Sequence, residues 1–236
     1  QIGSFTTVQI AALSSAQLQA IETSDVAGID TTQIQALSST QVSYLLTNQI
    51  QQLSSAQLQA IETADIAGLS TTQVTVISSN QIAGLTTAQI VALSSSQVGQ
   101  LATAALAQVS STQLRAIETA DIAGLTTAQI VALSSTQIGS FTTAQIAALS
   151  NTQLQAIETS DVAGIDTTQI QALSISQVGS LSTDQIQQLS SAQLAAIEIG
   201  DIAGLKTTQV AIISSTQIAG LTTAQIVALS SNQVGQ

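Results

Sequence analysis

The chain has 236 residues, no Cys, His, Met, Trp or Pro, and a net charge of −11 from thirteen acidic residues against two basic ones. The missing Cys excludes a disulfide framework and thiol chemistry, and the acidic balance argues against nucleic acid and anionic membranes as partners. Hydrophobic residues make up 44% of the chain. Their runs are too short to cross a bilayer, so we expect no membrane span.

An eight-residue repeat runs through the whole chain. Counted from Gln1, slot one of the octad holds Gln in 24 of 30 octads, Asp in five and Ala105 in one. Slot two is always Ile, Val or Leu, slot five is Leu, Ile, Val or Phe, and slots six and seven are mostly Ser or Thr. A fixed period of this kind predicts a repeat architecture, which grows by adding units and has no single central core.

Neither a continuous helix nor a regular strand fits the octad. In a helix, eight residues at about 100° each would rotate the apolar stripe by about 80° per octad, so the stripe could not face one core. In a strand, slots two and five are three residues apart and would point to opposite faces. A short helix that restarts in every octad does fit.

Each octad carries the signals of a helix start. Thr6 and Gln9, three residues apart, predict a capping box, in which each side chain binds a backbone N–H of the other residue. Phe5 before the cap and Ile10 after the box predict a hydrophobic staple. The same signals recur throughout, for example at residues 85–90. Each octad is therefore expected to form about one and a half turns of helix.

Slot six does not always hold a capping residue. Leu46, Ala102 and Lys206 occupy it in three octads, and each is followed by Thr in slot seven, which allows the cap to shift by one residue. All thirteen acidic residues fall in slots six, eight and one, between the expected cap and the third helical position. Negative charge is favourable there because of the helix dipole, so the acids support the predicted helix starts.

One octad cannot fold alone. Its two buried aliphatic side chains contribute about 3–6 kcal/mol, whereas ordering eight residues costs about 12 kcal/mol. The sequence therefore predicts an all-α fold: a solenoid, or superhelix, of short capped helices, one per eight-residue repeat. We expect a single continuous solenoid over residues 1–236. Small residues in slot four, such as Ala12 and Gly68, would let neighbouring turns approach closely.

The sequence also contains repeats that are longer than the octad. Residues 1–100 recur as residues 137–236, an offset of 17 octads, and the Asp octads, which carry Gly in slot four, follow one another after five, seven, five and five octads. We interpret the offset as a duplication. The usual spacing of five octads predicts a superhelical turn near five octads, with the acids along one edge. Because Gln236 falls in slot four, we also expect a piece or a processed form of a longer repetitive chain.

Several candidate binding features remain open. Glu in slot six followed by Asp in slot one places two carboxylates on one helix face, where stacked turns could bind Ca²⁺; the alternative is that these acids cap helices and keep the surface soluble. Gln in slot one could form ladders between turns or serve the capping box alone. Rows of Thr and Ser could bind ice or carbohydrate. The calcium candidates are Glu22, Asp25, Glu62, Asp65, Glu118, Asp121, Glu158, Asp161, Glu198 and Asp201.

No catalytic residue and no other cofactor is expected. The chain has no His or Cys to act as base or nucleophile, and its two cations, Arg115 and Lys206, lie in different octads. We therefore expect that the protein is not an enzyme and has no small-molecule substrate.

Residues 125–133, LTTAQIVAL, resemble the Leu-Thr/Ser-x-x-Gln-Ile/Val-x-x-Leu repeats of very large bacterial surface exoproteins, often labelled as adhesion or haem-utilisation proteins. The resemblance covers the whole chain and implies secretion and an extracellular or cell-surface role. With no His, Cys or Met, haem binding is not implied. The stretch is also similar to the first helix of TAL-effector DNA-binding repeats, but that family is basic and has a much longer period.

These observations favour an extracellular structural protein that self-associates into a rod or filament of stacked octads. The alternative is an adhesin stalk or binding module, whose repetitive Thr/Ser or acidic surface engages carbohydrate, ice or Ca²⁺.

Overall fold

The computed structural model describes residues 2–235, and its backbone contacts form two compact units, Gln1–Gly124 and Leu125–Gln236. Between residues 2 and 235 the chain forms short helices joined by extended linkers, with no strand. The predicted all-α architecture with one short helix per octad is thus confirmed. The octads run without interruption through both units, and their continuity as a single solenoid over residues 1–236 remains a prediction.

Each helix of the first unit has between three and six residues. In chain order these are η1 (Ile2–Ser4), α1 (Thr7–Ala11), α2 (Ser15–Gln19), α3 (Thr23–Val26), α4 (Thr31–Gln35), α5 (Ser39–Tyr44), α6 (Thr47–Gln52), α7 (Ser55–Ala60), α8 (Thr63–Ile66), α9 (Thr71–Val74), α10 (Ser79–Gly84), α11 (Thr87–Val91), α12 (Ser95–Val98), α13 (Thr103–Leu106), α14 (Ser111–Ala116) and η2 (Thr119–Gly124).

The second unit repeats the same kind of element. Its helices are α15 (Thr127–Val131), α16 (Ser135–Ile138), α17 (Thr143–Ala148), α18 (Asn151–Gln155), η3 (Thr159–Gly164), α19 (Thr167–Gln171), α20 (Ile175–Ser180), α21 (Thr183–Gln188), α22 (Ser191–Ala196), α23 (Ile199–Ile202), α24 (Thr207–Val210), α25 (Ser215–Gly220), α26 (Thr223–Ala228) and α27 (Ser231–Val234).

The N-cap stays in slot six even where that residue cannot cap. Leu46 is the N-cap of α6, which begins at Thr47, and the backbone N–H of Leu46 donates to Oε1 of Gln49 at 2.8 Å. Ala102 and Lys206 are likewise the N-caps of α13 and α24. The prediction of a one-residue shift was therefore wrong. In α6 the Gln half of the box suffices, because it binds the backbone of slot six and needs no side chain there.

Slots two and five form the interior of each unit. In the octad of α10, for example, Ile82 is fully buried and Leu85 nearly so. Leu85 is also where the helix ends: its backbone is extended, while its N–H still donates to the carbonyl oxygen of Ile82 at 3.1 Å. The extended residue turns the chain toward the next cap and returns its own side chain to the core. Burial of both positions stabilises each octad by about 3–6 kcal/mol.

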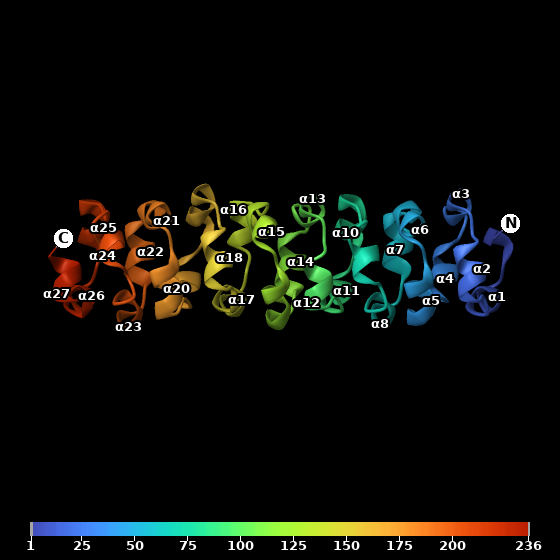
Figure 1. Cartoon of the computed structure of the whole chain (residues 1–236), viewed down its shortest axis with the longest axis horizontal. Coiled ribbons are helices and arrows are strands. Elements are labelled where there is room, and N and C mark those ends of the chain that lie inside the picture. Colours follow the sequence, from blue (N-terminus) through green and yellow to red (C-terminus); the bar gives the residue numbers. More distant parts are fainter. Residues whose placement is uncertain (1, 236) are drawn as a thin grey trace. The chain divides into compact units, whose positions relative to one another are not determined.

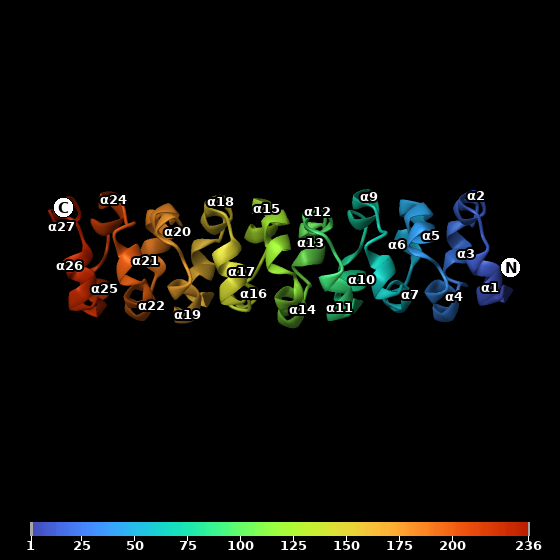
Figure 2. The ribbon, with the colours of Figure 1, turned by 90° about the horizontal axis from the view of Figure 1, so that it is seen from below.

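Neighbouring turns bring together helices that lie three octads apart. Helix α7 packs against both α4 and α10, and Figure 1 shows two further such pairs of the first unit, α3 with α6 and α10 with α13. In Figure 2 the second unit shows α19, α22 and α25 side by side in the same way.

The number of octads per turn differs from the prediction. Hydrogen bonds between turns join residues 25 to 31 apart, so one turn takes between three and four octads. The predicted turn of five octads was wrong. The length of a turn is set by the bend between successive helices, which is common to all octads. The five-octad spacing concerns only the Asp octads, which do not set this bend.

Glycine permits the closest approach between turns. No Gly among residues 2–235 has a positive φ, so these residues are not needed for a left-handed backbone. A Cβ on Gly99 would lie 2.5 Å from the carbonyl oxygen of Gly124, and a Cβ on Gly124 would collide with the carbonyl of Ser95. Small residues in slot four therefore act as predicted, by letting backbone meet backbone across the turns.

None of the helices in the described part of the chain is both long and apolar enough to cross a membrane.

Candidate functional site

The capping box is the local feature that repeats most faithfully. In α10, Oε1 of Gln81 accepts a hydrogen bond from the backbone N–H of Ser78 at 2.8 Å, and Oγ of Ser78 accepts from the backbone N–H of Gln81 at 3.4 Å. The predicted boxes at Thr6 and Gln9 and at Thr86 and Gln89 are also present. The sequence prediction of the helix starts is thus confirmed at the level of individual bonds.

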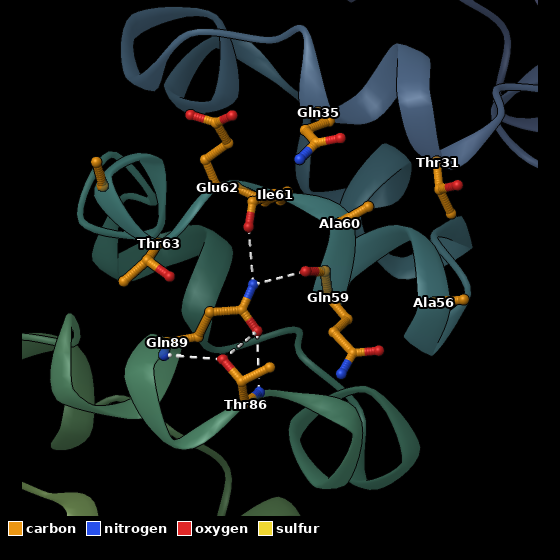
Figure 3. A pocket seen from close by; sticks show the side chains of 11 residues that line it. Thr31, Gln35, Ala56, Gln59, Ala60, Ile61, Glu62, Thr63, Thr86 and Gln89 are labelled. Atoms are coloured by element: carbon orange, nitrogen blue, oxygen red, sulfur yellow. Dashed lines mark hydrogen bonds between the residues drawn. The ribbon is translucent and has the colours of Figure 1, made fainter.

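The same Gln side chain also joins adjacent turns. Nε2 of Gln81 donates to the carbonyl oxygens of Ile50 and Leu53, at 2.8 and 2.7 Å. Figure 3 shows Gln89 in the equivalent position: its amide nitrogen donates to the carbonyls of Gln59 and Ile61, both at 2.8 Å, while its amide oxygen faces its own cap. Each such Gln therefore has two roles, and the two readings that the sequence left open are both correct.

We call this double set of bonds the glutamine bridge. In every case the amide nitrogen donates to the slot-five carbonyl 28 residues earlier, at distances of 2.5–3.0 Å. Bridges are formed by Gln33, Gln41, Gln49, Gln57, Gln73, Gln81, Gln89, Gln97 and Gln113 in the first unit and by Gln153, Gln169, Gln177, Gln185, Gln193, Gln209, Gln217, Gln225 and Gln233 in the second. All of these Gln residues are buried, so the bridge satisfies polar groups that water cannot reach.

Octads without Gln in slot one lack the bridge. Ala105 is buried but offers no amide to the carbonyls of Val74 and Ile77, which occupy the positions that a slot-one Gln would bridge. An ionised Asp in slot one accepts hydrogen bonds but cannot donate one to a carbonyl. The Asp121 octad forms the 3₁₀ helix η2, and the Asp65 octad forms the four-residue helix α8. These octads therefore meet the preceding turn without a glutamine bridge: η2 packs against α12, and α8 packs against α5.

The acidic residues in slot six behave in two different ways. Glu22, Glu62, Glu158 and Glu198 are N-caps without a side-chain capping bond, so the expectation that these four glutamates act as caps was wrong. The shorter Asp30 and Asp166 do cap their helices. The hydroxyl of Thr32, 2.6 Å from Oδ1, and the backbone N–H of Gln33, at 2.8 Å, lower the pKa of Asp30 below its ordinary value.

The paired acids do not gather along one edge. In the first unit, the pairs at Asp25 and Asp65 are five octads apart, which is neither one turn of 28 residues nor two, so they face different sides, contrary to the prediction. The pairs at Asp65 and Asp121 are seven octads apart, which is two such turns. Within residues 2–235 no three acidic side chains come together in a group that could hold a metal ion. Each calcium candidate pair, such as exposed Glu62 with half-buried Asp65, therefore offers two carboxylates, whereas Ca²⁺ takes six to eight oxygen ligands.

A surface hollow of about 780 Å³ lies beside Glu62 in the first unit. Figure 3 shows Glu62 and Gln35 on one side of it and Gln59 and Gln89 on the other. Glu62 is the one charged residue of its lining, and the others carry amides, hydroxyls or small apolar groups. The hollow can offer hydrogen bonds to a polar ligand.

Comparison with known families agrees with the repeat seen in the structure. A model of the ALTTAQ repeat matches five successive segments, residues 18–55, 58–95, 114–151, 154–191 and 194–234. The chain belongs to the ALTTAQ repeat family. The starts of the five ALTTAQ matches follow one another after five, seven, five and five octads, the intervals that also separate the Asp octads. No curated protein matches the chain.

The family repeat and the structural repeat have different lengths. The ALTTAQ unit of the sequence spans five octads, whereas a superhelical turn takes between three and four. One pattern in the sequence does reflect the length of the superhelical turn. Gly in slot three is followed by Gly in slot four three octads later, as in Gly99 with Gly124 and Gly139 with Gly164. These are the pairs that meet between turns.

Proposed function

We propose that this ALTTAQ-repeat protein is an extracellular or cell-surface structural protein whose octad helices stack into a rod or filament. The observation that carries the proposal is the glutamine bridge. It uses the same atoms at the same spacing of 28 residues in both units. Each turn therefore supplies the carbonyl acceptors for the Gln side chains of the next turn. An architecture of this kind grows by addition, without a change of design.

The composition supports the same proposal. The buried polar side chains are almost all slot-one Gln, and these are committed to joining turns. The net charge of −11 favours solubility and argues against nucleic acid as a partner. We accordingly propose a protein without enzymatic activity or a resident cofactor. The resemblance of its octads to those of large bacterial surface exoproteins supports a location outside the cell.

Electron microscopy tests the structural role. We expect purified chain at rising concentration, and the native material, to form uniform fibres whose width does not change along their length. Discrete particles at all concentrations would contradict the proposal. Immunogold labelling of intact cells tests the location separately: label on the outer surface is expected, and label confined to the cell interior would contradict it.

The hollow beside Glu62 supports a second candidate, a binding module for a polar ligand such as a carbohydrate. Its lining of Gln and Thr side chains provides donors and acceptors. Binding to an array of glycans, lost in Gln35→Ala and kept in the exposed control Gln52→Ala, would support this candidate.

Calcium binding by the paired acids is tested by adding Ca²⁺ to chelator-treated protein: a large rise in melting temperature would establish a role for these acids.

A further inference from the structure

The hollow beside Glu62 lies between two pairs of packed helices in the first unit. One pair is α4 with α7, and the other is α8 with α11. Figure 3 shows that the side chains around the hollow come from both pairs. Its volume of about 780 Å³ falls within the range of about 300–1,000 Å³ that is usual for small-molecule sites. The hollow is therefore large enough to hold a sugar unit.

A glutamine bridge fixes one wall of this hollow. The amide nitrogen of Gln89 donates to the carbonyls of Gln59 and Ile61, both at 2.8 Å, and its amide oxygen accepts from the N–H of Thr86 at 3.0 Å. The bridge thereby holds the backbone that carries Gln59 and Glu62, while both of these side chains stay exposed. Because this wall is in place before a ligand arrives, less free energy is lost in ordering it on binding.

The carboxylate of Glu62 is not used by the helix that it precedes. Glu62 is the N-cap of α8 but makes no capping bond through its side chain. Around it the lining offers the amides of Gln35 and Gln59 and the hydroxyls of Thr31 and Thr63, all on exposed residues. A carboxylate binds a cationic nitrogen through a charge-assisted hydrogen bond, and amides and hydroxyls can donate to hydroxyl groups or accept from them. These groups therefore suit a ligand that carries an ammonium among hydroxyls.

The duplicated part of the chain keeps the carboxylate but changes the groups beside it. Glu198, 17 octads after Glu62, is its equivalent. Ala195 and Ile199 stand where the first copy has the Gln amide and the Thr hydroxyl that line the hollow. Ile199 is 54% exposed, so an apolar residue is tolerated at this surface position. The second copy thus provides a control in which the charge is the same and its polar neighbours differ.

We propose that the hollow of the first unit binds an amino sugar whose amine is free and protonated. The ammonium donates to the carboxylate of Glu62, and the ring hydroxyls bind the amides of Gln35 and Gln59. The net charge of −11 favours the approach of such a cation. The inference rests on the binding module proposed above as the second candidate function, and it names the chemical class of that module's ligand.

Titration of the whole chain, followed by the NMR signals of the ligand, tests the chemical class. The probes are a glucosamine tetramer, its N-acetylated form, a glucose tetramer and diaminobutane. We expect the glucosamine tetramer to bind most tightly, because the two other sugars lack the ammonium and diaminobutane lacks the hydroxyls. Equally tight binding of the N-acetylated tetramer would overturn the role of the ammonium. Equally tight binding of diaminobutane would overturn the role of the hydroxyls.

Three variants test the position of the site. Glu62→Gln should weaken binding of the glucosamine tetramer about three- to tenfold, whereas the matched control Glu198→Gln should bind as the unaltered chain does. The double variant Gln59→Ala/Thr63→Ile introduces the residues of the second copy and keeps the carboxylate; it should weaken binding by a similar factor. Equal losses in Glu62→Gln and Glu198→Gln, or undiminished binding in the double variant, would overturn the assignment to this hollow.

The same titrations separate this inference from the function on which it rests. A glucose tetramer that binds as tightly as the glucosamine tetramer, with binding lost in Gln35→Ala, would overturn the preference for an amine and leave the binding module standing. A chain that binds none of the three tetramers and no glycan of the array would overturn both.

Discussion

Replacing Gln81 by Ala removes one glutamine bridge from the interior of the first unit. The buried carbonyl of Leu53 loses its donor, and the N–H of Ser78 loses its acceptor; the carbonyl of Ile50 keeps the N–H of Leu53, at 3.2 Å. One buried unpaired carbonyl costs about 1–3 kcal/mol and half a capping box about 1 kcal/mol, so we expect a loss of about 2–4 kcal/mol.

Urea denaturation followed by circular dichroism measures this loss, and hydrogen exchange shows where it occurs. Exchange should quicken first around residues 50–53 and 78–81. Gln52→Ala is the control, because Gln52 is an exposed Gln in slot four and its removal should change stability by less than about 0.5 kcal/mol. If Gln81→Ala were no more destabilising than Gln52→Ala, the bridge would not be what holds the turns together.

Three further outcomes follow from the contacts. Ala105→Gln should stabilise the chain by about 1–3 kcal/mol by adding a bridge, seen as a higher urea midpoint; an unchanged midpoint would contradict it. Gly124→Ala should cost about 1–3 kcal/mol because its Cβ meets the backbone of the preceding turn, whereas Gly200→Ala, with open space around it, should be neutral or stabilising. The pKa of Asp30 is lowered in the fold, so its capping contribution is present above the unfolded pKa, near 4, and is lost as the pH falls through the folded pKa. The stability difference from Asp30→Asn should follow that course, and a difference independent of pH would refute it.

The helix starts could be predicted because they depend on residues three apart. Thr86 and Gln89 form their box within one octad, and the apolar residues on either side show which positions face the core. At Leu46 the same spacing holds, but the missing hydroxyl led to the expectation of a shifted cap, which does not occur. The outcome depends on Gln49, whose bond to the backbone of slot six holds without a hydroxyl.

The failure of the Glu caps also has a local cause that spacing does not reveal. Asp30 places its carboxylate within reach of the helix N–H groups, whereas Glu62 carries one more methylene and makes no capping bond. Slot position and charge are alike in the two residues, but Glu62 has the longer side chain and is followed by Asp65 where Asp30 is followed by Gln33, the partner in its capping box.

By itself, the sequence determined that the chain folds as short capped helices, one per octad, with slots two and five inside. Those properties are local and repeat in octad after octad. The length of the superhelical turn was decided by tertiary structure, because it depends on small bends between successive helices that add up over several octads. The same stacking gave Gln its second role, since the carbonyls that it bridges lie 28 and 31 residues away and reach it only once the turn has closed.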